Sequence, residues 1–164
     1  MLVQQLSRVL SAAPLISPCD GIVVRHYEDA TDAERWVELI NLAFRDETPP
    51  MRCWTIRDFE QRVMQQPGWT PGDLFLAYTA NDQLVGSVSI AFRRHPSGRQ
   101  PALHLMAVRP DARRQGIARM LVAMLESTVW HRGYREIVLE THAGWQDAAQ
   151  FYAALGYQLR TPTR

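Results

Sequence analysis

The sequence has few of the features that mark nucleic-acid-binding, membrane-spanning or exported proteins. Its charges nearly balance, with a formal net charge of +1 over 164 residues, and a general nucleic-acid binder would be strongly basic. No apolar run approaches the roughly 18 residues that a membrane-spanning helix needs. Residues 1–16 have neither a basic region nor a long apolar core, so they do not resemble a signal peptide.

Cysteine is also scarce, since the chain has two, Cys19 and Cys53. Their spacing fits neither a metal site nor a disulfide framework, so we expect free structural thiols, no bound metal and a cytoplasmic protein. A chain of 164 residues is long enough to bury a hydrophobic core and most often forms one domain. We therefore expect one domain that needs neither a nucleic acid nor a membrane as its partner.

Residues 1–20 resemble an extension added to that domain. Leu2, Leu6 and Leu10 form a weak helical stripe, and Pro14 and Pro18 follow it. Such a segment would pack on the domain or on a second copy of it, as in a homodimer, and the sequence leaves both possibilities open. The domain itself would then comprise residues 21–164.

Apolar periodicity and turn residues predict alternating strands and helices after residue 20. The capping signatures Thr31-x-x-Glu34 and Thr55-x-x-Asp58 mark the starts of the first two helices. Residues 93–101 are expected to form a turn, and Gly133 a helix C-cap. Strands are expected at residues 21–27, 73–79, 84–92, 103–108, 136–141 and 157–160, and helices at 32–45, from 55 to about 67, from about 116 to 132, and at 146–155.

The stretch Leu103–Leu121 combines a buried strand, a short basic loop and the start of a helix. Its first six residues suit a buried strand, and apolar residues recur at helical spacing from Ile117 onward. In the first helical turn, Gly116 leaves the backbone open to a ligand. Unpaired N–H groups and the positive end of the helix dipole would meet there, so this stretch predicts an anion-binding site.

The loop resembles the pyrophosphate loop of the GNAT superfamily of N-acetyltransferases, V-x-P-x-x-R-x-x-G-[IV]-[GA]-x-x-L. It lacks the G-x-G-x-x-G pattern of a Rossmann loop and the Gly-Lys-Ser/Thr ending of a P-loop. The matching positions are Val108, Pro110, Arg113, Gly116, Ile117, Ala118 and Leu121.

This resemblance extends over residues 21–160 and implies the GNAT fold. That fold is of the α/β (α+β) class, with a mixed, mostly antiparallel central sheet flanked by helices in the order β-α-α-β-β-β-α-β-α-β. Family members usually carry a further C-terminal strand, which we expect this sequence to lack. The last strand, residues 157–160, would then form an open edge or be covered by the N-terminal segment or a partner chain.

The resemblance also implies acetyl-CoA as a co-substrate, with its pantetheine arm between the strands 103–108 and 136–141. The main chain of Val108 would line this gap, and the N–H of Met106 would stabilise the negative charge that develops on the thioester oxygen. Arg119 and Arg109 would reach the 3′-phosphate or face water. The residues expected to hold the pyrophosphate are Arg113, Arg114, Gln115, Gly116, Ile117 and Ala118.

Family members often use a tyrosine of the final helix to protonate the leaving thiolate. Their pattern N-x-x-A-x-x-[LF]-Y-x-x-x-G-[FY] is matched here by Ala148, Phe151, Tyr152, Gly156 and Tyr157. The resemblance therefore implies that Tyr152 is the general acid, and the alternative is a packing role beside Phe151. Trp145 stands where the family commonly has asparagine, so the hydrogen bond of that asparagine is lost.

The general base is not defined by a motif. His104 precedes Met106 by two residues, so strand alternation places the two side chains on one face, and histidine titrates in a useful range. His142, then Asp46 or Glu47, are the further candidates, and a chain of water molecules is the main alternative.

Residues 45–72 are expected to hold the acceptor, with Trp54 and Trp69 available for an apolar pocket. Residues 64–78 also resemble mycothiol synthase-type acetyltransferases over a short stretch. Together these features predict an acetyl-CoA-dependent N-acetyltransferase that acetylates a primary amine of a small molecule or peptide by direct transfer in a ternary complex. The alternatives are a non-catalytic acyl-CoA-sensing module, and transfer of another acyl group or to a thiol or hydroxyl.

Overall fold

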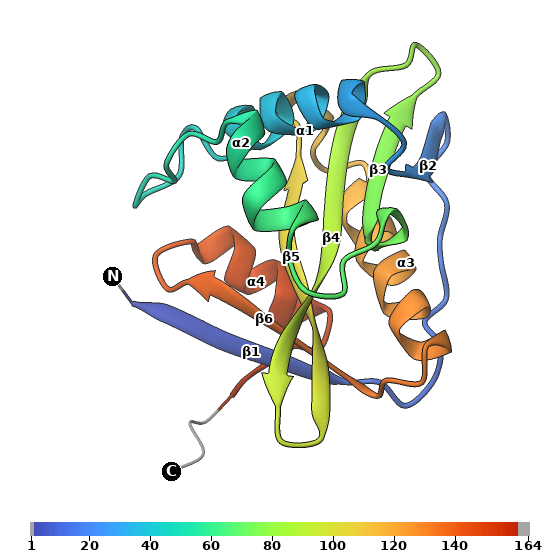
Figure 1. The fold of residues 1–164 in the computed structure, drawn as a ribbon, viewed down its shortest axis with the longest axis vertical. Helices are drawn as coiled ribbons and strands as arrows, with labels where there is room; N and C mark the ends of the chain where they lie inside the picture. The colour runs from blue at the N-terminus through green and yellow to red at the C-terminus, as the bar shows by residue number, and fades with distance from the viewer. Residues whose placement is uncertain (1, 161–164) are drawn as a thin grey trace.

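The computed structural model describes residues 2–160, so residues 161–164 of the expected domain lie outside the described residues. One seven-stranded sheet forms the centre, with the strand order β2-β3-β4-β5-β6-β1-β7 (Figure 1). The strands are β1 Val3–Val9, β2 Ile22–His26, β3 Leu74–Thr79, β4 Leu84–His95, β5 Gly98–Val108, β6 Glu136–His142 and β7 Gln158–Leu159. The α-helices are α1 Ala30–Ala43, α2 Ile56–Phe59, α3 Ile117–His131 and α4 Gln146–Ala154.

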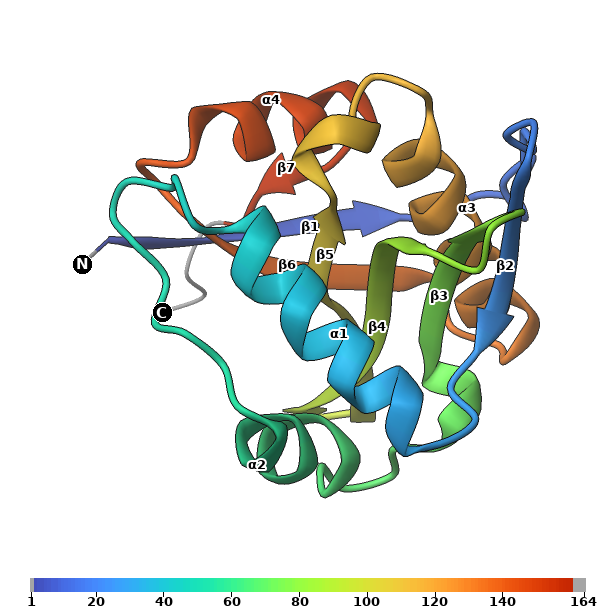
Figure 2. The same cartoon turned by 90° about the horizontal axis from the view of Figure 1, so that it is seen from above.

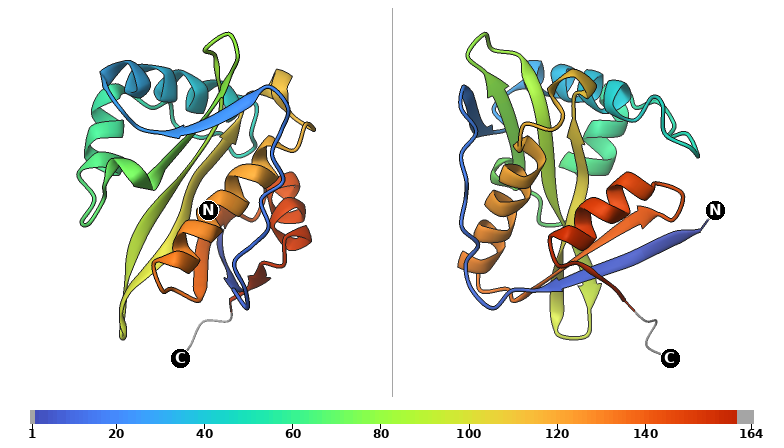
Figure 3. Two further views of the ribbon diagram at one scale, coloured as in Figure 1. Left: turned by 90° about the vertical axis from the view of Figure 1, so that its right-hand side faces the viewer. Right: turned by 180° about the vertical axis from the view of Figure 1, so that it is seen from behind.

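Helices cover both faces of the sheet, α1 and α2 on one and α3 and α4 on the other (Figures 2 and 3). Alternation along the strands gives each face its own core. Leu139 packs in the cluster that includes Leu121 of α3, and Leu76 packs in the cluster that includes Trp36 of α1 and Phe59 of α2. The two-layered core follows from the fully apolar strands that the sequence predicts, and the expected fold class is confirmed.

The N-terminal segment is an interior strand, so the helical stripe predicted for it was wrong. β1 pairs antiparallel with β6 and with β7, and Leu6 lies opposite both Leu139 and Leu159. Leu6 and Leu10 are buried in the cluster that includes Leu121 of α3, whereas Val3, Gln5 and Val9 are exposed, so odd and even positions face opposite sides as in a strand. The last strand, β7, pairs with the N-terminal segment on one side, and within the described residues its other side is the edge of the sheet.

A buried carboxylate fastens β1 to the rest of the molecule. Glu126 of α3 accepts a hydrogen bond from Arg8 Nη1 at 2.7 Å and another from the Tyr157 hydroxyl at 2.9 Å. Burial raises the pKa of Glu126, while Tyr157 and Arg8 oppose this by stabilising the charged form. The cluster therefore joins β1, α3 and the end of α4.

The β4–β5 hairpin is longer than the sequence predicted, because residues 93–101 do not form an extended turn. β4 continues to His95 and β5 begins at Gly98, where φ is +119°. Arg93 pairs with Gln100 and Arg94 with Arg99. These polar residues hid the strands from a hydrophobicity pattern, because the hairpin extends beyond the other strands of the sheet (Figure 1).

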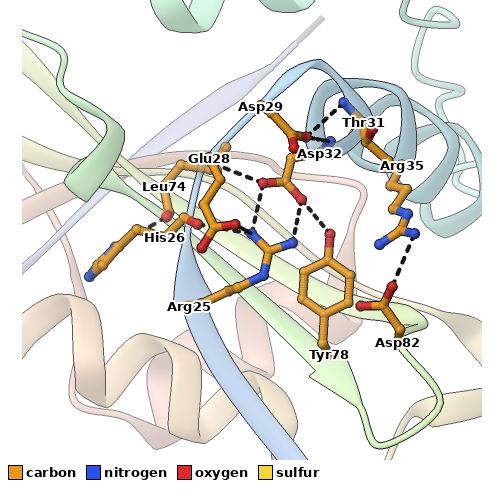
Figure 4. A network of polar contacts seen from close by, with 10 residues as sticks. All are labelled: Arg25, His26, Glu28, Asp29, Thr31, Asp32, Arg35, Leu74, Tyr78 and Asp82. Carbon is orange, nitrogen blue, oxygen red and sulfur yellow. Dashed lines mark hydrogen bonds and ion pairs between the residues drawn. The ribbon is translucent and has the colours of Figure 1, made fainter.

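Helix α1 starts at an ionic network rather than at the predicted Thr31 capping box. The side chain of Asp29 accepts hydrogen bonds from the Thr31 and Asp32 N–H groups and is the N-cap. Asp32 binds Arg25 through two 2.7 Å hydrogen bonds and the Tyr78 hydroxyl at 2.6 Å (Figure 4). The second predicted box, Thr55 with Asp58, is confirmed at the start of α2.

Candidate active site

The strands β5 and β6 run in parallel but stay paired over only two positions. Ala102 lies opposite Val138 and Leu103 opposite Leu139, and no further pairs follow between them in the described chain. A cleft of about 280 Å³ lies where the strands separate. Along this gap, the backbone N–H and C=O groups that face the other strand have no hydrogen-bond partner there among the described residues. A ligand can therefore take the place of the missing strand. This is the opening that we predicted between the two strands.

Both layers of the molecule contribute to the cleft wall. From the α1 side come Ala43, Phe44 and Glu47, and from the α3 and α4 side come Ala118, Ala148, Phe151 and Tyr152. The strands contribute residues 105–108 of β5 and Glu140 and Thr141 of β6. The walls of the cleft come from both faces of the sheet. Two ligands can therefore enter it from opposite faces.

The loop before α3 has the backbone conformation of an anion-binding turn. Arg114 has φ of +63° and Gly116 has φ of +84°, both in the left-handed region. Gly116 is the N-cap of α3, and no side chain caps this helix within residues 2–160. The N–H groups of the first turn are therefore free to bind an anion, with the helix dipole behind them.

The arginines around the loop have different roles. Arg113 donates hydrogen bonds to the carbonyls of Ala43 at 2.9 Å and Val108 at 3.4 Å, so its guanidinium ties the loop to the end of α1. Arg109 binds Asp111 and lies apart from the cleft, beside Leu84. Arg119, which we predicted as a possible contact of the 3′-phosphate, lines a large groove next to the loop.

That groove has a volume of about 680 Å³ and lies along the outer side of α3. Gly116 and Arg119 form one wall, and residues 14–20 of the segment between β1 and β2 form the other. The Cys19 thiol lies 3.5 Å from the carbonyl oxygen of Gln115 and holds this segment beside the loop. The groove therefore adjoins the anion-binding turn and offers space for a bulky group attached to the anion.

Tyr152 lies on the α4 wall of the cleft and is 7% exposed. Its ring packs edge-on against Phe151 and Tyr157. Burial raises the pKa of the phenol, because the charged form would lose its hydration. The hydroxyl therefore keeps its proton at neutral pH. A packing role and a proton-donating role are compatible at this position.

Trp145 connects the start of α4 to the loop after α1. Its Nε1 donates a hydrogen bond to the Pro49 carbonyl at 3.1 Å, and its ring packs near Phe44. At the neighbouring Gly144, a Cβ atom would lie 3.1 Å from the Thr48 carbonyl oxygen, so the two segments approach closely. The tryptophan thus joins the two segments at the cleft, whose wall it lines.

His104 lies outside the cleft, so the alternation argument that placed it beside Met106 was wrong. Leu105 has φ of +49°, and the β4–β5 register shifts there, which breaks the two-residue period. Met106 lines the cleft, whereas His104 lines a small separate cavity with Trp69. Burial, together with the charge of Arg93, lowers the pKa of His104 to about 4.

Carboxylates, rather than a histidine, surround the opening of the cleft. Glu47, Glu140 and Asp147 line it. Of the earlier candidates for the base, Glu47 lines the cleft, and Asp46 is a surface residue whose side chain is 85% exposed. His142 stacks near Trp145, and both its ring nitrogens are buried without a hydrogen-bond partner in the described chain.

Sequence reasoning missed Glu140 because no motif marks it. Strand alternation was the available signal, since it places Glu140 and Glu136 together on the face opposite Leu139, where Glu140 is exposed. Within residues 2–160 there is no group of three potential metal-ligating side chains. In the same range, no helix is long and apolar enough to cross a membrane.

Comparisons with known proteins agree with this geometry. A family model described as the Acetyltransferase (GNAT) family matches residues 33–157. Mycothiol acetyltransferase from Thermomonospora curvata is 27% identical over 155 residues, which are 93% of this chain and 50% of that protein. The chain thus spans about half the length of the curated relatives it matches. The resemblance to mycothiol synthase-type acetyltransferases, which we predicted from residues 64–78, covers most of the chain.

Solved structures show the same fold. A GCN5-related N-acetyltransferase from Sphaerobacter thermophilus aligns with a TM-score of 0.76 and 19% identity, covering 96% of this chain and 48% of that one. Naa50 of Arabidopsis thaliana, in complex with the bisubstrate analogue CoA-Ac-MVNAL, aligns with a TM-score of 0.66 and 20% identity, covering 86% and 85%. With its loop motif, its separated strands and its matching family model, this chain belongs to the Acetyltransferase (GNAT) family of acyltransferases.

Proposed function

We propose that this chain transfers an acetyl group from acetyl-CoA to a primary amine of a small molecule or peptide, directly within a ternary complex. The observation that carries the proposal is the cleft between β5 and β6, which has Tyr152 on one wall and Glu140 on the other. A related fold binds a bisubstrate analogue made of CoA and a peptide. That complex supports the use of one continuous channel for both substrates.

The anion-binding turn before α3 suits the pyrophosphate of CoA. The N–H groups between Arg113 and Ala118 would hold its two charges, with Arg114 as the exposed charged neighbour. The adjoining groove, lined by Arg119, would take the adenosine and its 3′-phosphate. Arg113 would act by fixing the loop, because its guanidinium is engaged by two backbone carbonyls.

The chemistry then takes place where the strands separate. The amine nitrogen attacks the thioester carbonyl, and the Met106 N–H would stabilise the resulting oxyanion. The C–S bond breaks and the thiolate leaves. Because burial keeps Tyr152 protonated but also makes it a weak acid, its first contribution would be a hydrogen bond to the thiolate, followed by proton transfer.

A carboxylate at the cleft opening would act as the base that removes the proton which the ammonium group must lose before its nitrogen can attack. Glu140 is our candidate, with Glu47 as the neighbouring carboxylate, because both line the cleft and carry negative charge toward a cationic amine. His104 is not proposed for this role, since it lines another cavity with Trp69 and does not line the cleft.

The test has two stages. Acetyl-CoA should raise the unfolding temperature of the protein, and Gly116→Trp should abolish this shift because it fills the turn and strains a residue with φ of +84°. A panel of primary amines should then release free CoA thiol. An absent thermal shift would refute the loop assignment. A shift without thiol release from any amine would instead support the non-catalytic acyl-CoA-binding module.

A further inference from the structure

A second cavity adjoins the active-site cleft and has the opposite charge. It has a volume of about 240 Å³ and lies where the β4–β5 hairpin meets β6 and β1. Its floor is formed by small or apolar residues, Ala102 and Val138. Three guanidinium groups, those of Arg93, Arg94 and Arg160, line its rim. We call this cavity the arginine groove.

The cations of the arginine groove have little to neutralise them. None of the three arginines forms an ion pair within residues 2–160. Glu140 is the one carboxylate that the described residues place in the lining, and its oxygen accepts a hydrogen bond from Gln5 Nε2 at 3.3 Å. By contrast, two other arginines, Arg25 and Arg132, are paired with the buried aspartates Asp32 and Asp73.

The groove is also partly built before any ligand arrives. Arg160 donates a hydrogen bond to Oε1 of Gln100 at 3.2 Å, and the Gln100 side chain is buried beneath it. Arg93 lies opposite Gln100 in the β4–β5 register. A fixed guanidinium loses less conformational freedom when it binds an anion, and its fork matches a carboxylate or phosphate.

Glu140 connects the two cavities, since it lines both the cleft and the arginine groove. On this face, α1 and α2 lie over β3 to β5, and within the described chain no helix lies over β6 and β1 (Figure 2). A ligand can therefore extend from the cleft past Glu140 into the arginine groove. Its amine end would meet carboxylates, and its far end would meet guanidinium groups.

We propose that the acceptor is an amine that also carries an anionic group, a carboxylate or phosphate, and that the arginine groove binds this group through Arg93 and Arg160. This inference rests on the proposed acetyl transfer. It specifies the acceptor class by charge: the cationic amine is placed at Glu140 and the anion several bonds away. Neutral amines of the same shape lack the second contact.

Matched acceptor pairs test this assignment. 6-Aminohexanoate is compared with 6-aminohexanamide, and glucosamine 6-phosphate with glucosamine, by the rate of thiol release from acetyl-CoA. The anionic member of at least one pair should have a kcat/KM at least about tenfold higher, as expected for one charge-assisted hydrogen bond. A preference for the anionic member of the carboxylate pair or of the phosphate pair shows which anion the arginine groove binds. Equal rates within both pairs would overturn the proposal.

Variants then locate the contact. Arg93→Gln and Arg160→Gln should raise KM for the preferred anionic acceptor about tenfold while leaving kcat and the neutral acceptor unchanged. Arg57→Gln is the matched control, because Arg57 is an exposed arginine of α2 outside both linings. Equal KM values for the parent and both groove variants would refute the role of the groove.

A binding measurement separates this inference from the proposed function. With CoA present, 6-acetamidohexanoate or N-acetylglucosamine 6-phosphate should raise the unfolding temperature more than 6-acetamidohexanamide or N-acetylglucosamine. Arg93→Gln should remove this difference. If no amine is turned over, the proposed function fails, yet this readout still decides the arginine groove. If amines are turned over and no anion-dependent shift occurs, only the inference fails.

Discussion

The network at the start of α1 allows a stability effect to be worked out from the structure. Burial by itself would raise the pKa of Asp32, but hydrogen bonds from Arg25, Tyr78 and the Glu28 N–H outweigh it and lower this pKa from 3.8 to about 2. Since a tenfold change in proton affinity equals about 1.4 kcal/mol, the ionised carboxylate contributes roughly 2.5 kcal/mol to the free energy of unfolding at neutral pH. Asp32→Asn removes the charge with little change of shape.

We expect Asp32→Asn to lower the free energy of unfolding by about 2 kcal/mol at neutral pH, measured by urea denaturation. For a chain of this size, that corresponds to roughly 4–8 °C in Tm. Because the folded pKa is depressed, the stabilisation is fully present above the unfolded value of 3.8 and is lost as pH falls through about 2. The gap between variant and parent should therefore shrink as the pH is lowered below about 4.

The matched control is Asp82→Asn. Asp82 also binds an arginine, Arg35 at 3.2 Å, but its side chain is 71% exposed, so solvent screens the pair. Asparagine also tolerates the left-handed conformation of this residue, with φ of +59°. We expect no measurable change. If Asp32→Asn were as stable as the parent at neutral pH, or if its deficit persisted undiminished in acid, the reasoning would be refuted.

Three further predictions concern the cleft and its support. Tyr152→Phe should lower kcat about 100-fold or more while the thermal shift with acetyl-CoA is retained, and an unchanged kcat would remove Tyr152 from the reaction. Glu140→Gln should lower kcat about tenfold or more, whereas Asp147→Asn on the same cleft should have a much smaller effect; equal effects would contradict the assignment of Glu140 as base. Arg8→Met should cost about 3 kcal/mol in urea unfolding, because it leaves the buried Glu126 without its cation; an unchanged midpoint would show that β1 does not depend on this pair.

Local patterns in the sequence predicted the strand, loop and helix start around Gly116, because the features involved lie close together in the chain. A buried strand, a basic loop, Gly116 and an amphipathic helix follow one another within Leu103–Leu121. The same is true of Tyr152, whose helix ends at a glycine. The Thr55 capping box and the fold class were also predictable, since each depends on spacing within or between neighbouring elements.

Only the tertiary structure decided which residues from distant segments share a surface. β1 is separated from β6 by more than a hundred residues of sequence. The few apolar residues of β1 could belong to a helix or a strand, and pairing of Leu6 with Leu139 and Leu159 decides for the strand. The bulge at Leu105 moved His104 away from the cleft, because one extra residue reverses strand alternation. Glu140 and the arginine groove became recognisable in the same way, since their chemistry depends on groups that the fold brings together.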